Sequence, residues 1–163
     1  MKRLSKQLFA LLHGSGKTLS TDESCTGGGI AQTIVQTAGA SEYFKGGVVS
    51  YCNEVKEQLL GVDHQVLEEQ TAVCEEVARQ MVQGACRALQ TDFAISATGL
   101  AGPGGGSEAI PVGTIFIACG SQDRVVVKRL SGDSGRERNL QRAIGEALQL
   151  LIDFLKGQTE NNC

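Results

Sequence analysis

The sequence predicts a single-domain α/β fold, an α/β/α layered sandwich with a mixed sheet. Strand-like and helix-like apolar patterns alternate along the 163 residues, which favours helices packed on both faces of one sheet. This length suits one ordinary domain with one core. Near the end of the chain, two strand-like segments flank the polar turn 121–123, and such a hairpin makes the sheet mixed instead of purely parallel. We expect one domain over 1–157 and a polar tail over 158–163.

Each element has its own pattern. Leucines recur at helical spacing near the start, so the chain opens with an amphipathic helix that Gly14 and Gly16 end. Helical spacing likewise predicts the later helices, and short apolar or β-branched runs predict the strands. The following elements are, in order, a strand over 18–23, a helix over 30–38, a strand over 48–52, a helix over 54–60 that ends at Gly61, a helix over 75–89, strands over 93–98, 113–118 and 124–130, and a last helix whose apolar face runs over 140–155.

The composition restricts the partners and the compartment. A formal net charge of −3, with 41% hydrophobic and 20% charged residues, is typical of a soluble globular protein and gives no electrostatic footprint for nucleic acid. No apolar run approaches the ~20 residues that span a bilayer, and polar groups interrupt the first residues too often for a secretory signal. We therefore expect a cytoplasmic protein without nucleic-acid or membrane partners.

The cysteines and histidines do not form a metal-binding pattern. No CxxC pair occurs, and only His13 and His64 are available to complement the thiols. We predict no metal, no cofactor and no disulfide framework. The six cysteines, expected to be reduced, are Cys25, Cys52, Cys74, Cys86, Cys119 and Cys163.

Two glycine-rich loops follow predicted strands. They read TDESCTGGG at 21–29 and ATGLAGPGGGS at 97–107. Bare backbone N–H groups and helix starts at such strand ends favour anions, so a phosphate or carboxylate ligand between the loops is one interpretation and plain tight turns are the other. Neither loop has GxGxxG in a dinucleotide-binding register. The GSGKT segment at 14–18 lacks the first glycine of a phosphate-binding P-loop, since Leu11 stands there.

Nucleophile candidates are more numerous than bases. Ser24, Cys25, Ser41 and Cys52 could attack a substrate, but there is no GxSxG elbow and hardly a histidine to act as base. This leaves a serine activated by a lysine, for which Lys56 is the candidate. A lysine with a pKa of ~10.4 must lose solvent or lie near another cation to serve as base. The alternative is a solvated lysine on an exposed helix face.

Three motifs carry a family resemblance across essentially the whole chain. ESCTGGG at 23–29, GASEYFKGGVVSYCNEVKEQLLGV at 39–62, and TGLAGPGGGS at 98–107 with PVGT at 111–114 resemble the C-terminal domain family of competence/damage-inducible protein CinA. Stand-alone members of that family are nicotinamide-nucleotide amidases. The resemblance implies hydrolysis of nicotinamide mononucleotide to nicotinate mononucleotide and ammonia by a serine/lysine mechanism in pyridine nucleotide salvage.

The resemblance also implies residue roles. Ser41 matches the nucleophile, Lys56 the base and Tyr51 a proton relay. Ser24, Thr98 and nearby backbone N–H groups are expected to orient the amide and stabilise the oxyanion. The second glycine loop and an arginine, Arg136 or Arg138, are expected to hold the 5′-phosphate. The full set of expected substrate-binding residues is Ser24, Thr26, Gly27, Gly28, Thr98, Gly99, Gly102, Gly104, Gly105, Gly106, Arg136 and Arg138.

Two alternatives to this interpretation stay open. The chain could be a catalytically silent paralogue that binds a pyridine nucleotide or a partner protein in the same cleft. It could also use Cys25 or Cys52 as the nucleophile. A small α/β domain of this kind commonly assembles as a symmetric dimer, so we also expect a homodimer.

Overall fold

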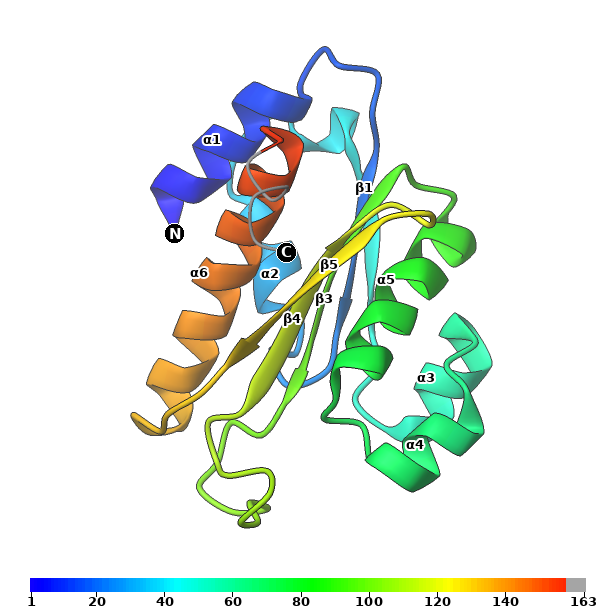
Figure 1. The fold of residues 1–163 in the computed structure, drawn as a ribbon. Helices are drawn as coiled ribbons and strands as arrows, with labels where there is room; N and C mark the ends of the chain where they lie inside the picture. Colours follow the sequence, from blue (N-terminus) through cyan, green and yellow to red (C-terminus); the bar gives the residue numbers. More distant parts are fainter. Residues whose placement is uncertain (158–163) are drawn as a thin grey trace.

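A five-stranded mixed sheet with strand order β2-β1-β3-β4-β5 forms the centre of the molecule (Figure 1). The computed structural model describes residues 1–157, so the predicted tail at 158–163 lies outside the described residues. β1 runs parallel to β2 and β3, while β3, β4 and β5 are antiparallel in turn. The strands are β1 (Leu19–Glu23), β2 (Phe44–Val49), β3 (Phe93–Gly99), β4 (Ile115–Gly120) and β5 (Val125–Leu130).

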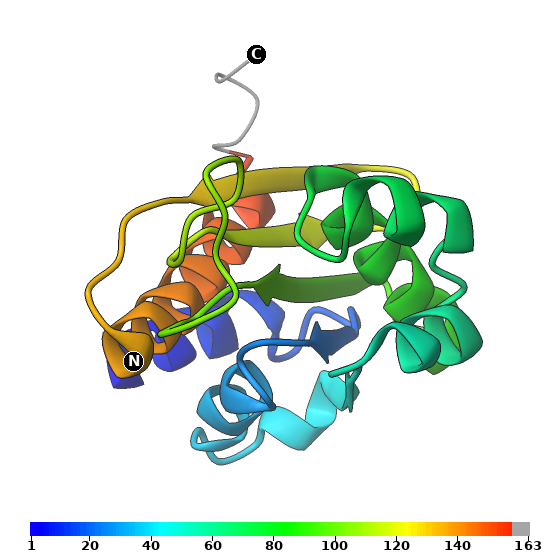
Figure 2. The same ribbon diagram turned by 90° about the horizontal axis from the view of Figure 1, so that it is seen from below.

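Helices cover both faces of the sheet, which confirms the predicted α/β/α sandwich (Figures 1 and 2). One layer pairs an N-terminal helix with the C-terminal helix, and the other packs its longest helix against all five strands. The first layer consists of α1 (Lys2–Leu12), α2 (Gly29–Val35) and α6 (Arg136–Leu155); the second consists of α3 (Asn53–Leu60), α4 (His64–Gln70) and α5 (Glu75–Leu89). A short 3-10 helix, η1 (Ala40–Glu42), precedes β2.

The two faces of the sheet differ in polarity at its centre. Ile95 and Ala97 of β3 belong to the apolar cluster under α1, α2 and α6, whereas Ala94 belongs to the cluster under α5. Because side chains alternate along a strand, Ser96 lies on the α5 side with Ala94, and its register partner on β1 is Asp22. Ser96 Oγ donates to the carbonyl of Ala78 in α5 at 2.7 Å. A buried polar strip therefore runs beneath α5.

Several details differ from the sequence prediction, including the bounds of β4, expected over 113–118, and of α2, expected over 30–38. The strand expected over 48–52 is β2, Phe44–Val49. The prediction began too late because a Gly46-Gly47 pair disfavours a strand, whereas in the structure both glycines lie inside β2. A Cβ added at Gly47 would lie 2.3 Å from Thr21 Oγ1, so the close approach of β1 requires glycine there. Sequence reasoning also missed α4 and η1. Gly61 ends α3 as predicted, and the structure shows it in a left-handed conformation.

Candidate active site

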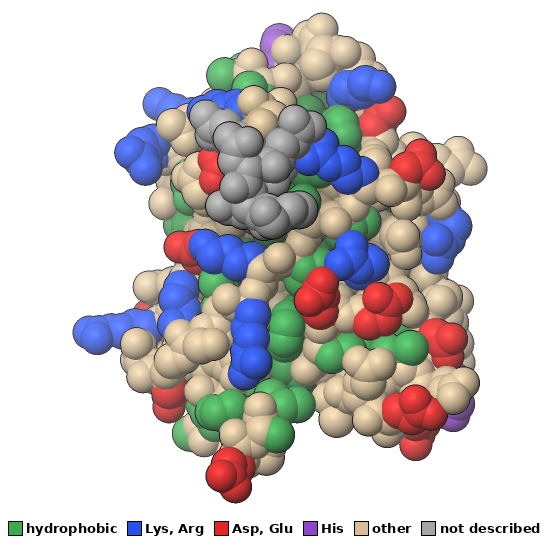
Figure 3. All heavy atoms as spheres, in the orientation of Figure 1, with side chains coloured by type: hydrophobic (Ala, Val, Ile, Leu, Met, Phe, Trp, Pro, Cys, Tyr) green, Lys and Arg blue, Asp and Glu red, His purple; other side chains and the backbone are tan. Residues whose placement is uncertain are grey.

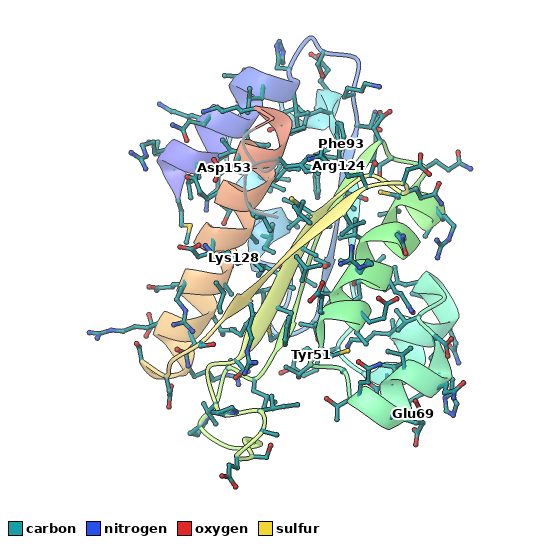
Figure 4. All side chains as sticks on the ribbon, in the orientation of Figure 1. Tyr51, Glu69, Phe93, Arg124, Lys128 and Asp153 are labelled. Carbon is teal, nitrogen blue, oxygen red and sulfur yellow. The ribbon has the colours of Figure 1, made fainter. Side chains whose placement is uncertain are left out.

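A cleft of about 280 Å³ lies at the carboxyl ends of β1, β2 and β3. The loop after β3 and the lobe of α3 and α4 border it, and they stand apart at the lower edge of the molecule (Figure 3). Tyr51, which follows β2, points into the space between them (Figure 4). The lining residues are Ser24, Cys25, Tyr51, Asn53, Lys56, Ala72, Val73, Thr98, Gly99, Leu100, Ala101, Gly102, Gly104 and Arg136.

Lys56 and Ser24 meet inside this cleft. Lys56 lies on α3 with only 1% of its surface exposed. Its Nζ donates to Ser24 Oγ at 2.9 Å and to the backbone carbonyl of Ser50 at 2.6 Å. Ser24 immediately follows β1, and α3 follows the neighbouring strand β2, so the parallel β1-β2 pair brings the two side chains to the same end of the sheet.

Burial changes the acidity of Lys56. Loss of solvent lowers the pKa of its ammonium, while the nearby Asp22 carboxylate partly opposes this effect. Desolvation is one of the two conditions under which a lysine can act as a base near neutral pH. The structure thus excludes the solvated lysine on an exposed helix face that the sequence left open.

Asp22 and Ser50 form a second buried contact behind Lys56. Ser50 Oγ donates to Asp22 Oδ1 at 2.6 Å, and both residues are fully buried. Burial raises the pKa of Asp22 to about 7, although the Ser50 hydrogen bond and Lys56 both pull it down. Asp22 Oδ2 has no hydrogen-bond partner among the described residues. Sequence reasoning missed Asp22, although its place within a buried strand was a usable signal, since acids are rarely buried without a partner.

Glu23 fixes the turn that carries Ser24. Its carboxylate accepts hydrogen bonds from Thr26 Oγ1 at 2.7 Å, from the Ile30 N–H at 2.8 Å and from the Ala31 N–H at 3.0 Å. A negative charge at the first turn of α2 is favourable because unpaired N–H groups and the helix dipole lie there. The Ser24 N–H donates to the carbonyl of Ala97 at 2.9 Å, which ties the turn to β3.

Arg136 connects the two sides of the cleft mouth. At the first position of α6, its Nη1 donates to the carbonyl of Gly102 at 2.8 Å, and Nη2 contacts the Tyr51 hydroxyl at 3.4 Å. Deeper in the cleft, Thr98 Oγ1 donates to the carbonyl of Ala72 at 2.8 Å. A cationic guanidinium at the mouth and a serine-lysine pair at the base suit an anionic substrate with a reactive carbonyl group.

Most of the predicted site residues converge on this cleft. Ser24, Lys56, Tyr51, Thr98, Gly99, Gly102, Gly104 and Arg136 line it, and Thr26, Gly27, Gly28, Gly105, Gly106 and Arg138 do not. The Thr26 hydroxyl instead donates a hydrogen bond to the Glu23 carboxylate. Sequence reasoning did not single out Asn53, Ala72, Val73, Leu100 and Ala101, which line the cleft, or Ser50 behind it.

Ser41 does not lie with Lys56. It belongs to η1, which precedes β2, and it lines a separate cavity with Val35 and Phe44. Lys56 follows the other end of the same strand, and a six-residue strand separates its ends by about 16 Å. In Figure 1 the cyan η1 segment lies at the upper end of β1, opposite the cleft. This placement departs from the expected Ser41–Lys56 pair, because residues before and after one strand lie at opposite edges of the sheet.

The cysteine alternative is weakened by burial. Cys25 lines the cleft but is only 8% exposed, and burial raises the pKa of its thiol to about 12. A thiol attacks as its thiolate, which this environment disfavours at neutral pH. Cys52 is exposed just before α3 and does not line the cleft.

Over residues 1–157, no group of three or more His, Cys, Asp or Glu side chains is arranged to hold a metal ion, and no helix could cross a membrane.

Comparisons with known proteins show which family the chain resembles over its length. The CinA C-terminal domain family matches residues 1–155. The chain is 41% identical over 152 residues to "Nicotinamide-nucleotide amidohydrolase PncC" of Escherichia coli strain K12, covering 93% of this chain and 92% of that protein. It is 37% identical over 156 residues to a "Putative competence-damage inducible protein" of Thermoanaerobacter pseudethanolicus. This match covers 96% of the chain but only 38% of the length of that longer relative.

A solved structure shares the whole fold. The crystal structure of competence/damage inducible protein CihA from Agrobacterium tumefaciens superposes with a TM-score of 0.91 at 36% identity, covering 95% of this chain and 94% of that one. The family match over nearly all of the described residues, the relatives above 30% identity and this common architecture confirm the resemblance seen in the motifs: the chain belongs to the CinA C-terminal domain family.

Proposed function

We propose that this chain is a nicotinamide-nucleotide amidase that hydrolyses the carboxamide of nicotinamide mononucleotide to nicotinate mononucleotide and ammonia. The observation that carries the proposal is the hydrogen bond between buried Lys56 and Ser24 inside the cleft. Similarity to the E. coli amidohydrolase over almost the full length of both chains supports the substrate. The reaction needs no cofactor, and it belongs to pyridine nucleotide salvage in the cytoplasm.

In the proposed mechanism Ser24, in place of Ser41, is the nucleophile. Neutral Lys56 takes the Ser24 hydroxyl proton along the 2.9 Å contact as Oγ attacks the carboxamide carbon. When the tetrahedral intermediate collapses, the C–N bond breaks and the Lys56 ammonium gives that proton to the leaving nitrogen, so ammonia departs. Water then attacks the ester and Lys56 takes its proton. As the C–O bond breaks, the Lys56 ammonium returns that proton to Ser24 Oγ, which restores the hydroxyl and the neutral amine, and the acid product leaves as its carboxylate after losing a proton to solvent.

The surrounding groups bind the substrate in this proposal. The backbone N–H groups of Cys25 and Thr26 follow the nucleophile in the turn, where they can stabilise the oxyanion; one such donor is worth about 10²- to 10³-fold in rate in related chemistry. Arg136 and the loop at Gly102 and Gly104 hold the 5′-phosphate. Tyr51, 63% exposed with its hydroxyl on Arg136, contacts the substrate at the cleft mouth instead of relaying a proton.

Ammonia release from nicotinamide mononucleotide tests the activity and the nucleophile together. We expect Ser24→Ala and Lys56→Met to lower kcat by at least about 10³-fold, since each removes a member of a unit that acts jointly. Ser41→Ala should retain activity because Ser41 lines a different cavity. Full activity in Ser24→Ala, or its loss in Ser41→Ala, would contradict the Ser24 assignment. Tight binding of the nucleotide by the wild-type protein without turnover would instead favour the silent paralogue.

A further inference from the structure

Behind the Ser24–Lys56 pair lies a contact that the proposed mechanism leaves unused. Ser50 bridges two groups: its hydroxyl donates to Asp22 Oδ1 at 2.6 Å, and its backbone carbonyl accepts from Lys56 Nζ at 2.6 Å. Lys56 Nζ in turn contacts Ser24 Oγ at 2.9 Å. Three hydrogen bonds, two of them joined through the covalent frame of Ser50, therefore connect Asp22 to the proposed nucleophile, and the four side chains involved are at most 9% exposed.

The buried carboxyl group of Asp22 is costly for folding. A buried polar atom without a partner destabilises a protein, and Asp22 Oδ2 has none among the described residues. The charged groups that face Asp22 are Lys56 from α3 and Glu23 from its own strand. Glu23 is occupied by the three donors of the α2 turn, and Ser96, the β3 neighbour, is bonded to α5. Among the charged groups of residues 1–157 that face Asp22, Lys56 is thus the one placed to benefit from its carboxylate.

We propose that Asp22 is a positioning residue that acts through Ser50 to hold Lys56 against Ser24 and to stabilise the ammonium that Lys56 forms during the reaction. This inference rests on the proposed Ser24/Lys56 mechanism. A base that is itself oriented by a third group recurs in enzymes with an activated nucleophile. Here Asp22 orients the Ser50 hydroxyl, the Ser50 carbonyl orients the amine, and the carboxylate supplies the opposite charge when the Ser24 proton arrives.

The substitution Asp22→Asn removes the negative charge of the side chain while keeping its shape. The amide is nearly isosteric and its oxygen can still accept from the Ser50 hydroxyl, so the variant should fold. We expect kcat to fall about 10²-fold, the lower end of what a positioned general base contributes, with little change in KM. The acidic limb of the kcat/KM profile should move to lower pH, because losing a nearby anion lowers the pKa of Lys56. The matched control is Asp123→Asn, on the exposed β4-β5 turn, which should change neither quantity.

An unmoved acidic limb in Asp22→Asn, or an unchanged kcat, would overturn the inference while leaving the proposed function intact. Ser50→Ala provides a second variant, since it keeps the carbonyl that Lys56 uses but removes the link to Asp22. It should lower kcat in the same direction as Asp22→Asn. Wild-type kinetics in Ser50→Ala would show that Asp22 does not act through Ser50.

A readout without substrate separates this inference from the proposed function. With lysine labelled at 13Cε, NMR titration reports the pKa of Lys56, whose signal is assigned by its disappearance in Lys56→Met. We expect that pKa to be lower in Asp22→Asn than in the wild type. If the wild type does not hydrolyse nicotinamide mononucleotide, the proposed function fails, yet this shift still supports the link between Asp22 and Lys56. An identical pKa in both proteins refutes the link whatever the substrate.

Discussion

The carboxylate of Glu23 performs a structural task one residue before the proposed nucleophile. Its three hydrogen bonds hold the Ser24 turn and the start of α2. In Glu23→Gln the charge is lost, and an amide NH₂ faces one of the N–H donors. We expect the free energy of unfolding to fall by about 2 kcal/mol, as for hydrogen bonds to charged groups, when measured by urea denaturation at pH 7.

The matched control for that substitution is Glu69→Gln. Glu69 lies on the outer side of α4 (Figure 4), is exposed, and accepts one hydrogen bond from Gln65. Its replacement should change stability by no more than about 0.5 kcal/mol. Equal effects of the two substitutions would mean that the Glu23 contacts contribute little to the turn.

Single residues also show the limits of sequence reasoning. Lys56, Ser24 and Thr98 could be identified because they stand in motifs that end predicted strands. The proximity of Asp22 to Lys56 could not be identified from the sequence, because it depends on the face of the sheet against which α3 packs. Ser41 illustrates the same limit: its motif directly precedes β2, and only the finished sheet reveals that this position lies at the edge away from the cleft.

At the level of elements, the position of Lys56, the proposed base, depends on how α3 packs against α5. Gly84 of α5 faces the end of α3 so closely that an added Cβ would lie 2.2 Å from the carbonyl oxygen of Leu60. We expect Gly84→Ala to lower the free energy of unfolding by about 1 to 3 kcal/mol through overpacking. Because α3 carries Lys56, kcat should also fall at temperatures at which the variant stays folded.

The same substitution elsewhere gives the control. Gly145 of α6 would place its new Cβ 3.2 Å from the end of the flexible Met1 side chain. Alanine is favoured over glycine in a helix by up to about 1 kcal/mol, so Gly145→Ala should leave stability unchanged or raise it. Thermal unfolding and ammonia release of both variants test the contrast, and a stable, fully active Gly84→Ala would refute the packing argument.

Helices and strands could be predicted where the hydrophobic pattern of the sequence matches the face that the element buries. The predicted helix over 75–89 matches α5, because its apolar face repeats at helical spacing and covers the sheet. β2 was placed too late along the chain, since Gly46 and Gly47 disfavour a strand locally and only the close approach of β1 explains them. α4 escaped detection because it has a single buried residue, Leu67, and so no repeating apolar face.

At the scale of the whole molecule, the buried thiols predict a loss of stability in alkaline solution. Burial raises the pKa of Cys25 to about 12 and that of Cys86 to about 11, and it also raises the pKa of Cys119. Above pH 9 the unfolded chain loses these protons while the folded one keeps them, so stability falls as pH rises from 9 towards 11. Lys56, whose pKa is lowered, acts in the opposite direction but is a single group.

Urea denaturation at pH 8.5 and 10.5 under reducing conditions measures this loss. Each thiol should contribute on the order of 2 kcal/mol at pH 10.5, from about 1.4 kcal/mol per pKa unit. Cys119→Ala removes one thiol and should show a smaller loss between the two pH values than the wild type. Stability that is constant or increases over this range would contradict the expectation.

The homodimer expected for a domain of this type stays a prediction. Sedimentation equilibrium tests it directly: a dimer has twice the protomer mass of 17.2 kDa. A single species at the protomer mass over micromolar concentrations would refute it.

Because β2 pairs with a single strand within residues 1–157, the proposed base and nucleophile are anchored unequally. Ser24 follows β1, which is paired on both sides, whereas Lys56 follows an edge strand with two adjacent glycines. Local opening of β2 with α3 would part the two residues while β1, β3, β4 and β5 remain paired. Amide hydrogen exchange over 44–56 should therefore accelerate on warming before that of the interior strands β1, β3 and β4, and the proposed ammonia release should be lost at temperatures at which most of the chain is still folded.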